Sequence, residues 1–281
     1  MTDTPWTWTA VAAVEQLKRG EITPRELLAS MRQRVEAVDP MVNALPTPCF
    51  DRAERFANRL EALPVADRGW FAGLPWPIKD SAAVSGVRTT WGSLAFADHV
   101  PETSDYIVEA IEAEGGVVFA KSNTPEFEAG ANTFNEVFGR TLNPWNLSRS
   151  AGGSSGGAAV AVATGMAFVA QGSDFACSLR YPAAFCNVVG LRPTPGVVPQ
   201  GPSALPGQML SVMGPLARNV EDVALALDGM ARFDARDRLS RPCGTASFLA
   251  AAQMPRAPIR TAFSMTLGGA AVDRAVQATL G

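Results

Sequence analysis

The feature that most constrains the fold is a glycine- and serine-rich stretch at residues 152–157 that leads directly into an apolar segment. The stretch reads Gly-Gly-Ser-Ser-Gly-Gly, and residues 158–166 after it are rich in alanine and valine. This pattern predicts a buried helix ending at Gly165, and residues 167–170 then predict a short buried strand. A loop, helix, strand and second loop return the chain to one edge of a sheet. Ser154 and Ser178, one on each loop, are therefore expected to lie close together.

A run of glycine and serine is also typical of a flexible linker. Here no change in composition and no charged spacer surrounds the run, and the apolar segment follows at once. We therefore interpret residues 152–157 as a structured loop.

A lysine upstream of both serines supplies a third candidate. Residues 74–78 read Leu-Pro-Trp-Pro-Ile, and Lys79 and Asp80 follow them. A Lys-Asp pair is usually an exposed ion pair, but the apolar neighbours predict a partly desolvated amine. Desolvation lowers a lysine pKa, and a neutral lysine can act as a base. The only histidine is His99, so a lysine and two serines offer the alternative to a histidine-activated nucleophile.

Taken together, these segments resemble the amidase signature family. The resemblance runs from about residue 7 to the C-terminus, and its landmarks follow in the family's order at residues 73–80, 121–127, 143–146, 152–157, 173–180 and 182–193. It implies hydrolysis of a carboxylic amide C–N bond through a serine acyl-enzyme intermediate. It also implies the amidase signature fold, an α/β fold in which helices flank a mixed central sheet.

The resemblance also implies a role for individual residues. Ser178 is the expected nucleophile, Ser154 the bridging serine held by a cis peptide bond, and Lys79 the base that acts through Ser154. The expected oxyanion hole consists of the backbone N–H groups of Phe175, Ala176, Cys177 and Ser178. Backbone donors aimed at a developing oxyanion typically contribute about 3 kcal/mol each.

The chain departs from the family pattern in two respects. Family members usually have two glycines before the nucleophile, where this chain has Ala176 and Cys177. If either position requires a positive φ, its Cβ costs on the order of 1 kcal/mol. We interpret Cys177 as a small buried filler rather than a second nucleophile. Family members are also usually longer, so we expect one amidase-type domain over residues 1–281 that lacks the C-terminal part of the fold.

Three functions remain open at this point. The first is amide hydrolysis, favoured because Lys79, Ser154 and Ser178 are all present. The second is the role of a glutamine-dependent amidotransferase subunit, and the third is that of a truncated non-catalytic relative with a binding or assembly role. The substrate is unknown. The aromatic residues near the motifs are Trp76, Phe127, Phe175 and Tyr181. They favour an apolar or aromatic acyl group, although packing in the core explains them equally well.

Composition narrows the remaining possibilities. The net charge is −3 and the pI about 5.3, which gives no nucleic-acid footprint. The longest apolar run, residues 156–170, is too short to span a bilayer, and residues 1–6 lack a signal-peptide pattern. Four cysteines show no metal-ligand spacing. We expect a cytoplasmic protein with no cofactor or metal that acts on a small-molecule amide. A homo-oligomer and a complementary chain are both open as partners.

Hydrophobic periodicity gives the expected elements. Apolar residues at three- and four-residue spacing predict helices, and short buried runs predict strands. Helices are expected at residues 9–17, 24–38, 51–63, 105–114, 220–230 and 272–280, and strands at 75–79, 117–120 and 259–264. A long surface loop is expected at 192–207.

Overall fold

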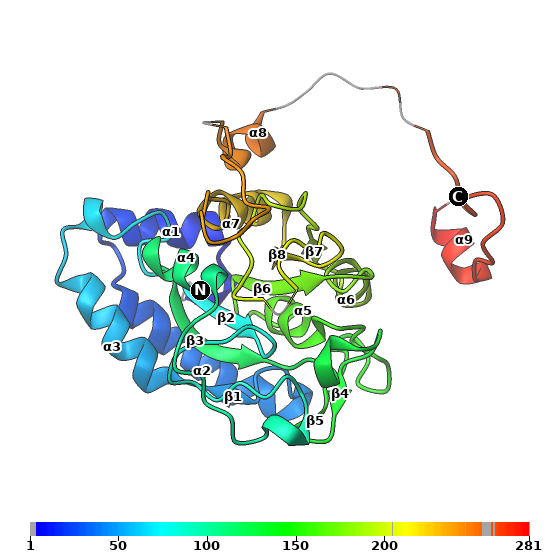
Figure 1. Cartoon of the computed structure of the whole chain (residues 1–281), viewed down its shortest axis with the longest axis horizontal. Helices are drawn as coiled ribbons and strands as arrows, with labels where there is room; N and C mark the ends of the chain where they lie inside the picture. Colours follow the sequence, from blue (N-terminus) through cyan, green and yellow to red (C-terminus); the bar gives the residue numbers. More distant parts are fainter. Residues whose placement is uncertain (1–3, 204, 245, 255–259, 261, 281) are drawn as a thin grey trace.

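The computed structural model describes residues 4–280, except for residues 204, 245, 255–259 and 261. Its centre is formed by two three-stranded sheets that meet along one edge of each (Figure 1). In the first sheet, β3 pairs in parallel with β2 and antiparallel with β1. In the second, β8 lies between β6 and β7 and is antiparallel to both. The strands are β1 (Thr47–Pro48), β2 (Pro75–Lys79), β3 (Val117–Ser122), β6 (Val169–Asp174), β7 (Val189–Gly190) and β8 (Val212–Ala217).

The two sheets join where β2 lies beside β6. At this seam the backbone N–H of Lys79 donates to the side-chain oxygen of Gln171 at 3.0 Å. The central sheet is therefore mixed, as expected. A separate hairpin is formed by β4 (Phe134–Asn135) and β5 (Gly139–Arg140).

Helices cover both faces of the central sheet. Successive strand side chains point to opposite faces, so Val118 packs in one core and Phe119 in the other. Helices α1, α4 and α7 supply the core that contains Val118, α3, α5 and α6 supply the other, and α2 contributes to both. The helices are α1 (Ala10–Arg19), α2 (Pro24–Val42), α3 (Phe50–Glu61), α4 (Tyr106–Ala113), α5 (Gly156–Ala163), α6 (Arg180–Cys186), α7 (Val220–Met230), α8 (Phe248–Gln253) and α9 (Arg274–Leu280).

Short 3-10 turns complete the described structure: η1 (Pro5–Thr7), η2 (Val65–Asp67), η3 (Leu94–Phe96) and η4 (Glu126–Glu128). Figure 1 shows α9 apart from the rest of the described structure. The single domain over residues 1–281 stays a prediction.

Most predicted elements are present, with shifted ends. Strand β2 and helix α7 have the predicted bounds, and Asn219 caps α7 by accepting from the N–H of Asp222. Helix α2 runs four residues past its predicted end, because a proline in the last turn, Pro40, removes only one donor. No strand forms at the described residues of 259–264, so that prediction is wrong there; Ile259 and Thr261 lie outside the described residues.

Two elements beside the serines were not predicted. Strand β8 contains Pro215 in a central position, where a missing N–H normally argues against a strand. Helix α6 has Pro182 as its third residue, where the first turn tolerates the missing donor. Because of these prolines, the sequence did not predict two elements that position the loop carrying Ser178.

The N-terminus of α5 packs against the backbone at the end of β3 through Gly157. A Cβ at this position would lie 2.3 Å from the Asn123 nitrogen and 2.6 Å from the Ala44 carbonyl oxygen. These neighbours are main-chain atoms, so a side chain forces the backbone apart.

We expect Gly157→Ala to lower the free energy of unfolding by about 2 kcal/mol, in the range of an overpacked core. Gly244→Ala is the matched control, because a Cβ there meets nothing within 4 Å. Denaturant unfolding of both variants measures the difference. Equal stability of the two would contradict the packing argument.

Candidate active site

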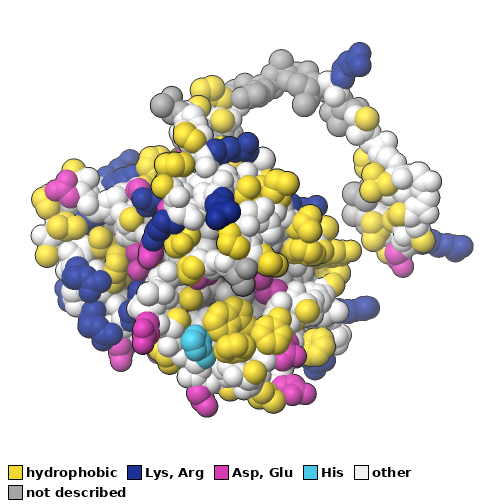
Figure 2. All heavy atoms as spheres, in the orientation of Figure 1, with side chains coloured by type: hydrophobic (Ala, Val, Ile, Leu, Met, Phe, Trp, Pro, Cys, Tyr) yellow, Lys and Arg dark blue, Asp and Glu magenta, His cyan; other side chains and the backbone are white. Residues whose placement is uncertain are grey.

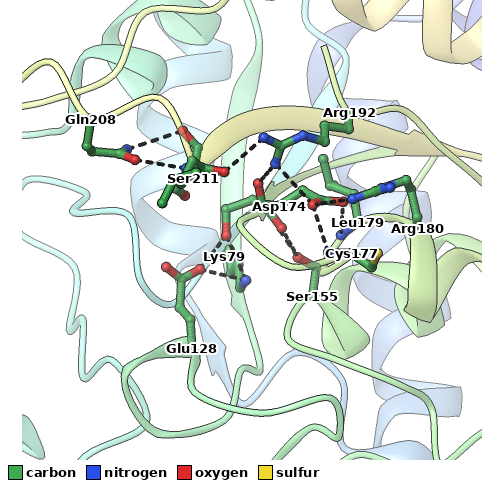
Figure 3. Close-up of polar contacts among 12 residues, drawn as sticks. Lys79, Glu128, Ser155, Asp174, Cys177, Leu179, Arg180, Arg192, Gln208 and Ser211 are labelled. Atoms are coloured by element: carbon green, nitrogen blue, oxygen red, sulfur yellow. Dashed lines mark hydrogen bonds and ion pairs between the residues drawn. The ribbon is translucent and has the colours of Figure 1, made fainter. Parts of the chain in front are cut away.

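The centre of the site is the amine of Lys79, the last residue of β2. The residue is fully buried. Its Nζ lies 2.6 Å from Ser154 Oγ, 2.8 Å from Ser173 Oγ and 2.6 Å from an oxygen of Glu128. An ammonium group has three N–H donors, so each donor of Lys79 has one acceptor. Figure 3 shows Lys79 and Glu128 pointing toward one another.

Burial and charge act in opposite directions at this pair. Burial lowers the pKa of Lys79, and the Glu128 carboxylate opposes that effect. Burial also works to raise the pKa of Glu128, but the Lys79 ammonium and hydrogen bonds from Lys79, Ser173 and Ser81 lower it below its usual value. The predicted desolvation of Lys79 is confirmed, and Glu128 is an ionised carboxylate against it.

Ser154 lies on the loop before α5 and is 1% exposed. Its peptide bond with Gly153 is cis, as the resemblance implies. The next residue, Ser155, donates its backbone N–H to the carbonyl of Ser178 at 3.2 Å. The two serine loops therefore touch, as the sequence predicts.

Ser178 lies between β6 and α6 and is 7% exposed. Within the described part of the chain, no hydrogen bond joins its hydroxyl to Ser154. The backbone N–H groups around Ser178 differ in whether they have an acceptor. The N–H of Cys177 donates to Asp174 Oδ1 at 2.9 Å, whereas no described residue accepts from the N–H groups of Phe175, Ala176 or Ser178. Three of the four predicted oxyanion donors are thus unoccupied.

The backbone of Cys177 has a φ of 71°. Left-handed backbone is uncommon for a residue with a Cβ and costs on the order of 1 kcal/mol. Cys177 is half-buried rather than buried, so its interpretation as a buried filler is wrong. Ala176 has no positive φ, so only one of the two altered glycine positions carries this strain.

Asp174, the last residue of β6, anchors the Ser178 loop. Its side chain is fully buried and accepts from the N–H groups of Cys177 and Leu179, from two nitrogens of Arg180 and from Arg192 (Figure 3). Burial opposes its ionisation, but Arg180 and the backbone donors outweigh burial and lower the pKa of Asp174 to about 2. This carboxylate therefore fixes both the start and the end of the loop.

His99 is not part of this site. It is exposed and lies against Trp91 and Phe96, where Figure 2 shows it among hydrophobic side chains. Among the described residues, no group of three or more His, Cys, Asp or Glu side chains could hold a metal ion. None of the described helices is long and apolar enough to cross a membrane.

A cavity of about 370 Å³ begins two residues after Lys79, at Ser81. Its lining includes Ser81, whose hydroxyl donates to Glu128 at 2.9 Å, and Met213 of β8. Asp105 also lines it, and burial raises the pKa of this carboxyl to about 7. The long loop predicted at residues 192–207 forms one side of the cavity. The cavity therefore connects to Glu128 through Ser81, which lines it and is hydrogen-bonded to that carboxylate.

Sequence reasoning missed two residues that contact Lys79. Ser173 belongs to the segment 173–180 that resembles the family. Its position on β6, five residues before Ser178, could have identified it as a residue near the site. Glu128 gives only a faint signal, as a charged residue before the small residues Ala-Gly-Ala. Its reach to Lys79 depends on the turn at η4.

We expect Asp174→Asn to lower the free energy of unfolding at pH 7 by on the order of 2 kcal/mol, since a pKa near 2 instead of about 3.9 stabilises the charged form. A lowered pKa contributes stability above the unfolded pKa and loses it as the pH falls toward 2. The gap between variant and wild type should therefore narrow below about pH 4. Denaturant unfolding at pH 7 and pH 3 tests this, and a gap that is constant with pH would refute it.

Comparisons of the sequence show which known proteins this chain resembles. The family described as Amidase matches residues 26–281. An acylamidase from Rhodococcus erythropolis is 40% identical over 285 residues, covering 99% of this chain and 59% of that protein. A glutamyl-tRNA(Gln) amidotransferase subunit of Prochlorococcus marinus (strain MIT 9303) is 37% identical over 88% of this chain and 51% of its own length.

Solved structures give the same result. A bacterial aryl acylamidase of the amidase signature family superposes with a TM-score of 0.80 at 35% identity, over 87% of this chain and 51% of that one. A 6-aminohexanoate cyclic dimer hydrolase in complex with its substrate gives 0.79 at 35% identity, over 87% and 50%. The chain spans about half the length of the relatives it matches. On its sequence and its fold, this chain belongs to the amidase signature family.

Proposed function

We propose that this chain carries the catalytic residues of an amide hydrolase, with Ser178 as nucleophile, Ser154 as the bridging serine and Lys79 as the base. The observation that carries the proposal is the 2.6 Å contact between Lys79 Nζ and Ser154 Oγ at a fully buried position. The loop of Ser154 is hydrogen-bonded to Ser178 itself. A buried lysine beside two serines is one of the known ways to activate a hydroxyl.

In the first half-reaction, the Ser178 oxygen attacks the amide carbonyl carbon. Its proton moves to Ser154 Oγ, and the proton of Ser154 moves to a neutral Lys79. The carbonyl oxygen becomes an oxyanion that the free N–H groups of Phe175, Ala176 and Ser178 stabilise. Hydrogen bonds between catalytic groups often tighten only when substrate is bound, so the missing contact between the two serine hydroxyls is compatible with this step.

The collapse of the tetrahedral intermediate breaks the C–N bond. The leaving nitrogen takes a proton back from Lys79 through Ser154, and Ser178 keeps the acyl group as an ester. Water then attacks the ester and gives a proton to Lys79 through Ser154; as the ester C–O bond breaks, that proton returns through Ser154 to the Ser178 oxygen and the carboxylic acid is released. The relay returns to its starting protonation state after each turnover.

Linear amides with an apolar acyl group are the proposed substrates. Phe127, Phe175 and Tyr181 lie within three residues of Glu128 or Ser178 in the sequence and are exposed, with 55%, 62% and 46% of their surface accessible. Trp76 is fully buried in the core, so its suggested part in the acyl pocket is wrong. The names of the related acylamidases support an acyl amide as the substrate.

A second candidate function is that of an amidotransferase subunit, which releases ammonia from glutamine. It is favoured by the similarity to glutamyl-tRNA(Gln) amidotransferase subunits from several organisms, at 37–40% identity. Parallel assays with glutamine and with an anilide of an apolar acid distinguish the two. Preferential hydrolysis of glutamine would favour the amidotransferase, and labelling of no serine by a fluorophosphonate would favour a non-catalytic relative.

Ser178→Ala should lower kcat by at least about 10⁴-fold, because the nucleophile is lost. The fold should persist. Anilide hydrolysis measures the loss, and mass spectrometry should locate a fluorophosphonate adduct on Ser178 and not on Cys177 of the wild type. Ser148→Ala, at an exposed serine, is the control with full activity. Near-normal turnover by the Ser178 variant would rule out the assignment.

Lys79→Arg should be inactive at every accessible pH, because a guanidinium does not release its proton. In the wild type, kcat/KM should rise with pH as the neutral fraction of Lys79 grows. A pH–rate profile from pH 6 to 10 checks both statements, with Lys18→Arg as the active control. A flat wild-type profile or an active arginine variant at position 79 would disprove the base assignment.

A further inference from the structure

A carboxylate reaches the proposed base from outside the proposed triad. Glu128 ends the surface turn η4, and its Oε1 lies 2.6 Å from Lys79 Nζ and 2.9 Å from Ser81 Oγ. The hydroxyl of Ser173 donates to the same oxygen. One carboxylate oxygen thus receives three donors at the inner end of a side chain that is itself only partly buried.

The groups in contact with Lys79 bear on the charge state of its amine. The Ser173 hydroxyl donates to Glu128 and accepts from Lys79. Ser154 and Glu128 accept the other two N–H groups of the lysine. A neutral amine could accept from the Ser154 hydroxyl on its lone pair, whereas the Glu128 carboxylate has no proton to give and favours an ammonium beside it. The contacts fit a charged ammonium facing an ionised carboxylate.

We propose that Glu128 is a positioning residue that holds Lys79 in its charged form in the resting site, so that the base is masked until the proton is removed or the carboxylate withdraws. This inference rests on the proposed function, in which Lys79 must be neutral to accept the proton of Ser154. It adds a fourth residue to the triad, one that acts on the reaction through Lys79.

The backbone of η4 is consistent with a carboxylate held in place by this contact. Phe127 has a φ of 48° and Glu128 a φ of 62°. Two consecutive left-handed residues with side chains cost on the order of 1 kcal/mol each. Contacts to Lys79, Ser173 and Ser81 offset that cost, because a charge-assisted hydrogen bond is about twice as strong as a neutral one.

Other charged groups around the pair are already compensated. Asp174 acts on Lys79 from β6, but Arg180 and Arg192 pair with it. Asp80, next to Lys79, lies 3.7 Å from Lys121 of the neighbouring strand β3. Asp105, at the start of α4, is attracted electrostatically by Lys121 and repelled by Glu128. Among the described residues, Glu128 is therefore the anion in direct contact with Lys79.

The chain permits a direct test because it contains only three lysines, Lys18, Lys79 and Lys121. Lysine labelled with ¹³C at Cε gives three signals by NMR, and the variants Lys18→Arg and Lys79→Met assign them. The titration midpoint of Lys79 is then followed in the whole chain, in wild type and in Glu128→Gln. This readout does not depend on turnover.

In Glu128→Gln the midpoint of Lys79 should fall by about 1–2 pH units, because an adjacent opposite charge shifts a pKa by about 1–3 units. At pH 7 the neutral fraction then grows, and kcat/KM for the anilide should increase about 10-fold. Above both midpoints the two rates should converge. Glu128→Gly, which suits a positive φ, should give the same shift if the glutamine variant folds poorly.

Glu126→Gln is the matched control, because this carboxylate belongs to the same turn but accepts from Ser93 at 2.7 Å. Its Lys79 midpoint should stay within about 0.3 units of the wild-type value, which is small beside the shift expected of a contacting charge. An unchanged midpoint in both Glu128 variants would overturn the inference, as would a lower midpoint with slower hydrolysis at pH 7. A lower midpoint with no hydrolysis by any form would keep the masking role and refute the proposed hydrolase.

Discussion

The buried ammonium of Lys79 is the constraint on which the rest of the site depends. An unpaired charge in a protein interior costs several kcal/mol even after relaxation, so this strand end must be surrounded by acceptors. Three segments supply them: Ser154 before α5, Ser173 at the end of β6 and Glu128 in η4. The requirement to satisfy one amine therefore draws three distant parts of the chain to the same point.

A second buried charge fixes the loop of the proposed nucleophile. Asp174 follows Ser173 on β6, and side chains of consecutive strand residues point in opposite directions. Ser173 contacts Lys79, while Asp174 holds Cys177, Leu179 and two arginines. Two neighbouring residues on one strand thus set the position of the proposed base relative to that of Ser178. This local coupling explains how a loop with a left-handed Cys177 keeps a defined shape.

Much of this arrangement follows from the sequence, because local patterns determine it. The apolar run before Lys79 predicts a buried strand, and the glycine-rich loop before an apolar helix predicts that Ser154 and Ser178 meet. Strand β8 escaped prediction because Pro215 lies in a central strand, an exception that only tertiary contacts reveal, and helix α6 because Pro182 lies in its first turn, where the missing donor is tolerated. Glu128 escaped because its position depends on a turn with two left-handed residues, a conformation that local propensity disfavours.

The same burial that makes Lys79 suitable as a base also creates the need for Glu128. Desolvation lowers the pKa of an amine and so favours the neutral form that accepts a proton. An adjacent carboxylate favours the charged form and removes the cost of burying it unpaired. With serine hydroxyls alone, desolvation would decide whether Lys79 is neutral or charged. A carboxylate at 2.6 Å shifts this equilibrium toward the ammonium. Glu128 is partly exposed and hydrogen-bonded to Ser81, which lines the cavity of about 370 Å³. A substrate that enters this cavity can therefore act on the charge state of Lys79 through Ser81 and Glu128.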